Sequence, residues 1–327
     1  MSYVMRSGWL LLLAALGCAE RPAAPAVAQT PPKKERPAPI DAAPTRIAAA
    51  AELPNALQLT PEVISGGQPD GEAGFERLQK LGVKTVISVD GAKPDVETAK
   101  KYGLRYVHLP HSYNGISDER VKELAKAVRD LDGPIYIHCH HGKHRSPAAA
   151  AAACKTAGLI TGHAADETLK VAGTNPNYVG LFQTVEKAAA LSDAELDSVP
   201  GDFPETVPPV GVAKAMGDVE HTFDHLKLIA AAGWKTPVDH PALSPAHEAL
   251  ILRECYTEML RTPEVAGQTD RFRELLTESE AHAKALEDLL AGDVDAAARV
   301  KAETVMKAVT KDCATCHREF RDVPLKK

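Results

Sequence analysis

The chain has 327 residues, 44% of them hydrophobic, which is enough for two compact domains and argues against disorder throughout. Its formal net charge of -6 and its scattered basic residues argue against a nucleic-acid partner, because binding to a phosphate backbone normally requires a clustered basic surface. Six cysteines are too few for a disulfide framework in this length, so we expect most of them to serve chemistry. Two of them, Cys154 and Cys255, are expected to be small buried hydrophobes.

Residues 1–18 have the layout of a secretory signal peptide. Arg6 precedes an apolar run from Trp9 to Leu16, and this run is too short to span a bilayer. The Ala-Leu-Gly-Cys sequence that ends at Cys18 resembles a bacterial lipobox, which implies cleavage before Cys18 and attachment of lipid to it. The alternative is an ordinary signal that is cleaved further on, near Ala28. We expect an exported protein on the periplasmic side, anchored to a lipid membrane as a lipoprotein.

Two segments have compositions typical of linkers. Residues 19–54 are rich in Pro and Ala and hold few large apolar side chains, so we expect an extended tether. Residues 199–209 concentrate Pro and Gly, which stop helices and strands. The sequence therefore predicts one domain over residues 55–198 and a second over residues 210–327.

The predicted first domain alternates between helical and strand-like segments. Helices are predicted over Glu72–Leu81 and Asp118–Leu131, and strands over Lys84–Val89, Leu104–Leu109 and Pro134–His138. This alternation indicates an α/β domain with a central sheet flanked by helices. After the second linker the pattern changes to long amphipathic helices, which indicates an all-α bundle.

The last predicted strand leads into residues 138–146, which read His-Cys-His-His-Gly-Lys-His-Arg-Ser and precede a helix. The spacing lets the N–H groups of this turn and of the helix start converge on an oxyanion, and the same field favours a thiolate at Cys139. Cys139 would be the nucleophile, Arg145 would hold two phosphate oxygens, and Ser146 would help the sulfur to leave. The predicted phosphate-binding residues are His140, His141, Gly142, Lys143, His144 and Arg145.

These residues match the H-C-x-x-G-x-x-R-[S/T] signature and resemble the cysteine-dependent phosphatases, most of all the atypical dual-specificity type of plants and fungi. The resemblance covers about Leu57 to Ala190 and includes residues 65–69, 82–87 and 109–110. It implies hydrolysis of phosphoesters through a phosphocysteine intermediate. The substrate would be a phosphorylated protein or a small polyphosphate, since this family includes enzymes that act on inositol pyrophosphates.

A general acid is harder to find, because no aspartate lies in the loop directly after the second strand. Asp118 is the nearest candidate, although it is also the kind of residue that a helix start favours. His111 and Asp90 are the other candidates. Without an acid, the alternative is a domain that binds phosphate and does not hydrolyse it.

Three histidines of the loop raise the question of a metal site. A loop whose N–H groups converge on an anion is not expected to aim His140, His141 and His144 at one cation as well. We therefore interpret them, with Lys143, as a widened positive field that suits a highly charged phosphate.

The last cysteines form a C-x-x-C-H sequence at residues 313–317. This spacing is typical of haem c, in which both thiols bond to the porphyrin edge and the histidine reaches the iron. A thioredoxin-like pair would need a preceding strand, and a zinc site would need two further ligands. The predicted attachment residues are Cys313 and Cys316, with His317 as iron ligand. The segment from Val210 to Arg321 resembles the cytochrome c′ family, which implies a four-helix bundle.

The sixth ligand of such a haem must come from the first helix of the bundle. The apolar residues of that helix recur at three and four positions and form its predicted buried stripe, namely Val212, Met216, Val219, Phe223, Leu226 and Ala230. Met216 is the tentative ligand, and five-coordinate iron is the alternative. His221 and His225 are expected to face solvent. The ligation of the iron would decide whether the haem exchanges electrons with a redox partner or binds a diatomic gas.

Overall fold

The computed structural model describes residues 38–48, 51–176, 178–209 and 211–321. The predicted signal peptide, Cys18 and most of the predicted tether lie outside these residues. Within the described part of the chain, no helix is both long enough and apolar enough to cross a membrane.

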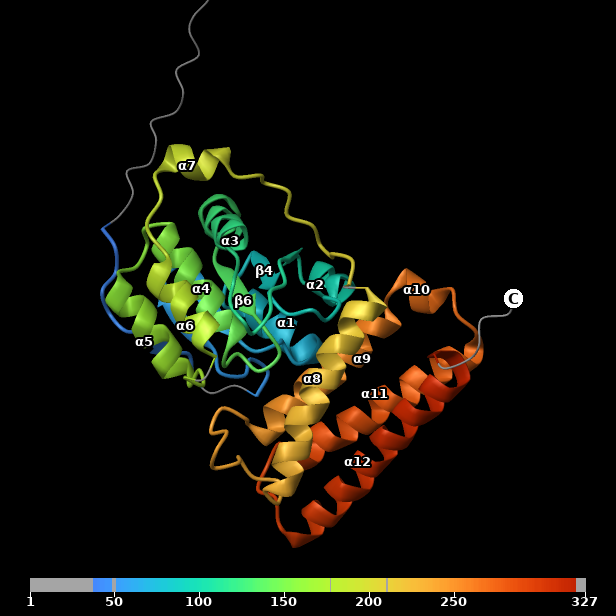
Figure 1. Cartoon of the computed structure of the whole chain (residues 1–327). Coiled ribbons are helices and arrows are strands. Elements are labelled where there is room, and N and C mark those ends of the chain that lie inside the picture. Colours follow the sequence, from blue (N-terminus) through green and yellow to red (C-terminus); the bar gives the residue numbers. More distant parts are fainter. Residues whose placement is uncertain (1–37, 49–50, 177, 210, 322–327) are drawn as a thin grey trace, which may run out of the picture. The chain divides into compact units, whose positions relative to one another are not determined.

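A six-stranded mixed sheet forms the centre of the first domain, with the order β1-β2-β3-β6-β4-β5 (Figure 1). The strands are β1 (Thr45–Arg46), β2 (Leu57–Thr60), β3 (Val63–Gly66), β4 (Thr85–Ser88), β5 (Arg105–His108) and β6 (Ile135–His138). Strands β3, β6, β4 and β5 are parallel, whereas β1 and β2 pair antiparallel at the edge. Because parallel strands end at one edge of a sheet, the loops after β4, β5 and β6 meet there.

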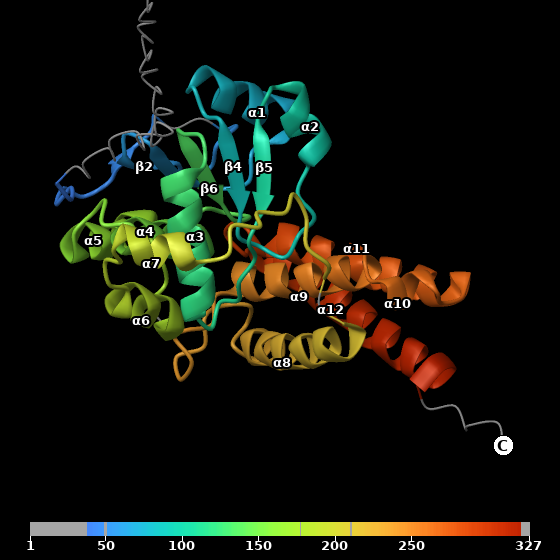
Figure 2. The same ribbon diagram turned by 90° about the horizontal axis from the view of Figure 1, so that it is seen from above.

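Helices cover both faces of this sheet. They are α1 (Gly71–Lys80), α2 (Val96–Lys101), α3 (Asp118–Asp130), α4 (Arg145–Thr156), α5 (Gly162–Ala172), α6 (Val179–Lys187) and the short α7 (Asp193–Ser198). Helices α1 and α2 lie on one side of the sheet, and α3 and α4 lie on the other (Figure 2). Successive strand side chains point to opposite faces, so Val86 packs with α1 and α2 while Ile87 packs with α3, α4 and α5. The predicted α/β architecture is confirmed.

Helix α4 lies at the centre of one of these layers. It packs against β3, β6, α3, α5 and α6. The six alanines from Ala148 to Ala153 are fully buried, because their small side chains allow neighbours to approach from all sides. The start of this helix, which directly follows residues 138–144, is thereby held in place within the domain.

The five predicted helices and strands are present, each within one residue of its predicted ends. The sequence analysis did not place β1, β2, β3, α2, α5, α6 or α7. Length alone does not separate these elements from the placed ones, because the placed strands β4, β5 and β6 also have four residues each.

Both predicted linkers are partly built into the first domain. Ile40 N donates to Leu159 O at 2.9 Å, and β1 pairs with β2, so the predicted tether does not extend to residue 54. In the second linker, Pro204 O accepts from His108 N at 2.8 Å. The outer strand β5 has unpaired backbone groups, and a Pro-rich segment with free carbonyls can satisfy them.

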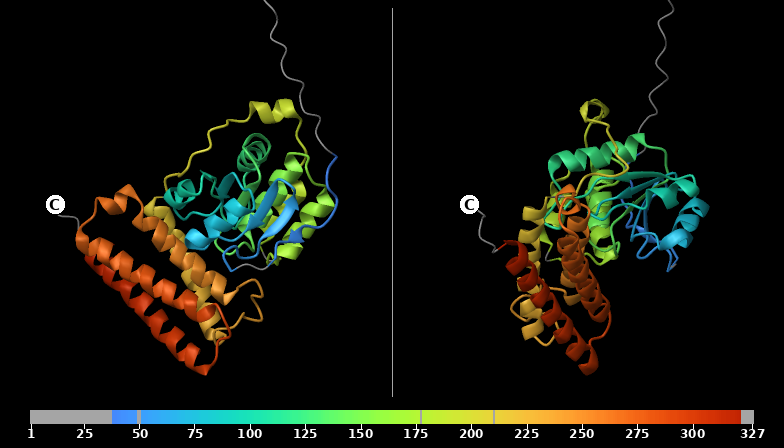
Figure 3. Two further views of the ribbon diagram at one scale, coloured as in Figure 1. Left: turned by 180° about the vertical axis from the view of Figure 1, so that it is seen from behind. Right: turned by 90° about the vertical axis from the view of Figure 1, so that its right-hand side faces the viewer.

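The C-terminal part is entirely helical in the residues described. It consists of α8 (Val212–Ala231), α9 (Pro245–Leu260), the short α10 (Pro263–Ala266), α11 (Asp270–Leu290), α12 (Ala296–Cys316) and a π-helical turn over His317–Arg321. The long helices lie side by side (Figure 3), with α9 packed against α8 and α11, and α11 against α12. Each contributes to one core, for example through Leu226, Leu252, Leu286 and Val309. The predicted change to an all-helical segment is confirmed.

Candidate active site

Residues 139–146, here called the cysteine loop, join β6 to the first turn of α4. Strand β6 places Cys139 beside the loop edge of the sheet, where the side chain is 3% exposed. At the other end, Arg145 begins α4 and is also 3% exposed. The structure therefore brings together the two residues that the sequence marked as nucleophile and phosphate clamp.

Three carbonyl groups of the cysteine loop are held from outside. His140 O accepts from Gln68 N at 2.9 Å, Gly142 O from Asn55 Nδ2 at 2.8 Å, and Lys143 O from Thr174 Oγ1 at 2.7 Å. In a trans peptide the C=O and the following N–H point in opposite directions, so the next N–H groups point away from these donors. An array of such N–H groups binds an oxyanion. Sequence reasoning missed Asn55 and Thr174.

Gly142 adopts a conformation that other residues avoid. Its φ is +70°, and a Cβ atom there would lie 2.4 Å from Gly67 N and 2.5 Å from Gly66 C. The loop therefore passes so close to the end of β3 that only glycine fits.

Gly142→Ala should lower the free energy of unfolding by more than about 2 kcal/mol and weaken binding of inorganic phosphate, because both φ and the backbone contact oppose a side chain. Gly103→Ala is the matched control. Gly103 has φ of +69° with nothing within 4 Å of its Cβ position, so its cost should be about 1 kcal/mol with phosphate binding unchanged. Denaturant unfolding and calorimetric titration measure both effects, and equal losses in the two variants would contradict the close-approach argument.

Ser146 contacts the sulfur of Cys139. The Oγ and Sγ atoms are 3.3 Å apart, and Ser146 Oγ also donates to Gly66 O at 2.9 Å. A hydroxyl has one proton, so it can serve either Gly66 O or a sulfur anion. Ser146 is therefore positioned to redirect its proton to the sulfur as the sulfur becomes negative.

Arg145 has two partners that the sequence did not indicate. Its Nη2 donates to Glu254 Oε1 of α9 at 2.7 Å, and its guanidinium carbon lies 4.3 Å from the centre of the Tyr113 ring. Its Nε is buried without a hydrogen-bond partner among the described residues. The guanidinium is thus oriented by an aromatic face and a carboxylate, and its Nε donor remains without a partner in the described part of the chain.

The histidines of the loop do not converge on one point. His140 Nε2 and His141 Nε2 lie 3.4 Å and 4.0 Å from Glu287 Oε1 of α11. The ring of His144 lies elsewhere, 4.9 Å from that of His247. As expected, His144 shares no site with the other two histidines. His140 and His141, however, both lie beside the same carboxylate oxygen of Glu287.

The cluster of His140, His141 and Glu287 has the donor types of a cation site, with its ligand atoms within 4.8 Å of one another. The other oxygen of Glu287, however, accepts from Arg253 Nη1 at 2.9 Å. Burial opposes ionisation of Glu287, but the hydrogen bonds from His140 and Arg253 outweigh it and lower its pKa to about 2. A metal ion here would lie beside a guanidinium, so we interpret the cluster as an ion-paired carboxylate.

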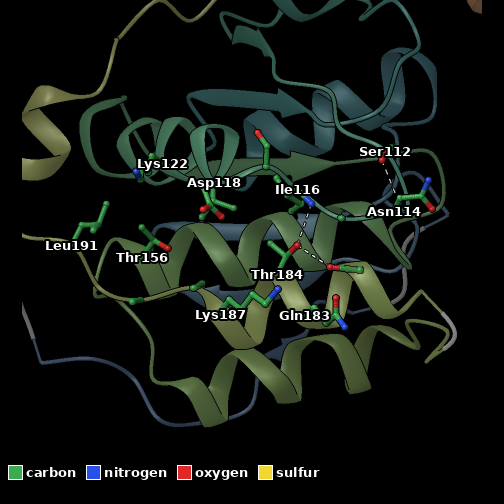
Figure 4. A pocket seen from close by; sticks show the side chains of 16 residues that line it. Ser112, Asn114, Ile116, Asp118, Lys122, Thr156, Gln183, Thr184, Lys187 and Leu191 are labelled. Carbon is green, nitrogen blue, oxygen red and sulfur yellow. Dashed lines mark hydrogen bonds between the residues drawn. The ribbon is translucent and has the colours of Figure 1, made fainter. Parts of the chain in front are cut away.

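Asp118 lies away from the cysteine loop. It is exposed at the first turn of α3 and lines a cavity of about 590 Å³ together with residues of α6 (Figure 4). Among the residues described, no residue of the cysteine loop forms a hydrogen bond or ion pair with it. The preceding Ser117 caps the helix by accepting from Arg120 N, and a carboxylate next to such a cap stabilises the helix dipole. The observed surroundings of Asp118 are those of a helix start, and its catalytic role stays a prediction.

The two other acid candidates are more buried. His111 Nδ1 lies 2.9 Å from Ser112 O, while burial lowers the pKa of His111 to about 4 and keeps it neutral at neutral pH. Asp90 follows β4 and is 2% exposed. One of its oxygens accepts from Ala92 N at 2.9 Å, and the other is buried with no hydrogen-bond partner in the described chain.

The C-terminal cysteines lie within one turn at the end of α12. Cys313 and Cys316 are free, and both are half-buried, as is His317. Cys313 Sγ is 3.6 Å from Tyr256 OH of α9, and His317 Nε2 is 3.5 Å from Arg321 Nη1. Two accessible thiols and an imidazole on one turn fit covalent attachment and ligation of a haem.

The other residues named in the haem prediction belong to α8. Met216 is half-buried and packs against the helical core, which is the expected position of the stripe. His221 is exposed as expected. His225 does not simply face solvent: it is half-buried, and its Nδ1 lies 2.9 Å from Glu248 Oε2, because a buried carboxylate needs a partner.

No family model matches the chain, and no curated protein does. Slightly less than half of the chain is similar to solved structures, which it matches over most of their own length. The crystal structure of TpbA from P. aeruginosa is 21% identical, covers 46% of this chain and 92% of its own, and has a TM-score of 0.38. The core catalytic domain of the PP-IP phosphatase SIW14 from S. cerevisiae, in complex with citrate, is 20% identical with the same coverages and the same TM-score.

Proposed function

We propose that the first domain is a cysteine-dependent phosphatase that hydrolyses phosphoesters through a phosphocysteine intermediate. The observation that carries this proposal is the cysteine loop, whose carbonyls are held outward while Cys139 and Arg145 stand at its two ends. In a loop built in this way the backbone N–H groups are already oriented toward a tetrahedral oxyanion, and such preorganised donors stabilise a phosphoryl transition state.

In the first step, the Cys139 sulfur attacks phosphorus and the bond to the leaving oxygen breaks. The loop N–H groups and Arg145 balance the charge on the other phosphate oxygens, and a general acid protonates the leaving group. Asp118, His111 and Asp90 are the candidate acids. In the second step, water attacks phosphorus and passes a proton to the group that acted as general acid, now a base. The S–P bond breaks, the Cys139 thiolate leaves, and Ser146 stabilises it by redirecting its hydroxyl hydrogen bond from Gly66 O to the sulfur.

The experiment that tests this reaction is rapid acid quenching of the purified protein during turnover of an aryl phosphate. A phosphorylated thiol should accumulate and should be recognised by the phosphorus NMR shift of an S–P bond. Turnover with the phosphoryl group found on a histidine would disprove the phosphocysteine mechanism. Absence of turnover across pH would favour a non-catalytic phosphate-binding domain instead.

The substrate is proposed to be a highly charged phosphate, on a protein or as a small polyphosphate. Lys143 and the half-exposed His140 and His141 surround the loop with groups that donate to anions. A preference for polyphosphates over singly phosphorylated compounds, measured as kcat/KM, would support this assignment. An opposite preference would exclude it.

We propose further that the C-terminal helices form a four-helix bundle of the cytochrome c′ type that carries one haem c. Cys313 and Cys316 would hold it, His317 would ligate the iron, and Met216 is the tentative sixth ligand. When bound, the haem would supply an iron for electron transfer to a redox partner or for binding a diatomic gas. An optical spectrum of the exported protein reports the ligation, since a Met-ligated and a five-coordinate iron absorb differently.

We also propose that the chain is an exported lipoprotein of the periplasmic side. The support is the signal layout and the lipobox-like sequence before Cys18, which lie outside the described residues. Mass spectrometry of the mature N-terminus should find Cys18 with lipid attached. A mature chain that begins near Ala28 would disprove the anchor.

A further inference from the structure

The guanidinium of Arg145 is the group on which phosphate oxygens would bind, and in this structure it already binds an anion. Its Nη2 donates to Glu254 Oε1 at 2.7 Å. Glu254 belongs to α9, outside the phosphatase domain, and is 109 residues further along the chain. A carboxylate presents two oxygens to an arginine fork much as a phosphate does.

We propose that the C-terminal helices inhibit the phosphatase from within the chain: the Glu254 carboxylate takes the place of a phosphate oxygen on Arg145, and substrate binds only when α9 withdraws it. The inference rests on the proposed phosphatase function and adds a regulatory contact to its site.

The burial of this pair argues against simultaneous binding. Arg145 is 3% and Glu254 17% exposed as side chains, so a second anion has little access to the same guanidinium edge. Burial raises the pKa of Glu254 above its ordinary value, although the charge of Arg145 opposes the shift. The charge of Arg145 favours the carboxylate form of Glu254, and because the two side chains are in direct contact, a phosphate that binds the same guanidinium edge must displace the carboxylate.

A second carboxylate contacts the same loop from a different helix. Glu287 of α11 lies 3.4 Å from His140 Nε2 and is fixed by Arg253 of α9. The basic side chains that would attract a phosphate thus face carboxylates from two helices. A single chance contact would not produce this charge complementarity at both ends of the loop.

Helix α9 also covers the aromatic side of the loop. The ring of His247 lies 4.4 Å from that of Tyr113, which itself stacks on Arg145. Further along, Arg261 Nη1 donates to Gly91 O at 2.7 Å. The contacts from His247 to Arg261 run along the whole of α9, so release of Glu254 requires movement of the helix and not only of one side chain.

Glu254→Gln in the full-length, haem-loaded protein tests the proposal. Removing the charge while keeping the shape should raise kcat/KM for p-nitrophenyl phosphate by about tenfold. In a Cys139→Ser background it should tighten the Kd for inorganic phosphate by a similar factor. Glu254→Asp, which draws the carboxylate back by one methylene, should give a smaller change in the same direction.

Glu248→Gln is the matched control. Glu248 is a buried carboxylate on α9 as well, but it pairs with His225 of α8, so its loss should leave both measurements unchanged. If phosphate binding is unchanged or weaker in the Glu254 variants, Glu254 positions Arg145 and does not compete with substrate, and the inhibition proposal fails. If the wild type and every variant lack turnover, the proposed phosphatase function fails, and the phosphate titration still decides whether Glu254 occupies the anion site.

Discussion

Replacing Cys139 by serine should lower kcat for aryl phosphates by at least about ten-thousandfold while the protein remains folded. The expected loss is of the order seen when a nucleophile is removed from a hydrolase. A serine hydroxyl is a much weaker nucleophile than a cysteine thiol, and Cys139→Ser leaves the held carbonyls of the loop untouched. Steady-state hydrolysis of p-nitrophenyl phosphate measures the effect, with inorganic phosphate binding as the readout that should persist.

The chain offers a matched control in the same helix layer. Cys154 is fully buried in α4, and burial raises the pKa of its thiol to about 12, so it is inert. Cys154→Ala should therefore keep its kcat. Residual turnover of Cys139→Ser above one percent of wild type, or a loss of activity in Cys154→Ala with phosphate binding intact, would require a different nucleophile.

Replacing both Cys313 and Cys316 by serine should remove covalent haem completely. Thioether bonds survive denaturation, so the wild-type polypeptide should carry haem on a denaturing gel and the double variant should carry none. Both thiols are half-buried and lie on one turn of α12, where a porphyrin edge can reach them. In-gel haem peroxidase staining gives the answer directly.

Cys255→Ser serves as the control for this second experiment. Burial raises the pKa of the Cys255 thiol to about 12, and its sequence has no neighbouring C-x-x-C-H pattern, so haem attachment should be unaffected. His317→Ala should keep the covalent haem but shift its absorption bands, because the iron loses its ligand. A double cysteine variant that still stains would show that attachment occurs elsewhere.

The parts of the fold that follow from local pattern were predictable. Helix α3 has apolar residues at helical spacing, and β6 is a short apolar run before a turn, so both were placed within one residue. Strands β2 and β3 were not, because each holds only two large apolar residues and has no large apolar residue beside it in the sequence, whereas β4 and β5 continue into apolar neighbours. The β1 pairing and the docking of Pro204 depend on unsatisfied backbone groups of other strands, which no local pattern reveals.

The residues of the candidate site also divide into those that a local sequence pattern reveals and those that only the fold brings in. Cys139, Arg145 and Ser146 were recognisable because one turn of chain holds them all. Asn55 and Glu254, which fix the loop and occupy its clamp, are 87 and 109 residues away from their partners. Asp118 stayed ambiguous because a carboxylate at a helix start satisfies a structural rule as well as a catalytic one, and the sequence alone cannot separate them.

Helix α9 contacts both the cysteine loop and the proposed haem site. Glu254 contacts Arg145 of the cysteine loop, and Tyr256, two residues further on, contacts Cys313 of the proposed haem site. Thermodynamic linkage makes any coupling through this helix reciprocal. If reduction of a haem on Cys313 changes the affinity of the loop for phosphate by some factor, phosphate must change the reduction equilibrium of that haem by the same factor. A potentiometric titration with and without phosphate would then measure this coupling as a shift in the reduction potential of the haem. The size of the shift would report how strongly α9 links the haem to the binding of phosphate at Arg145.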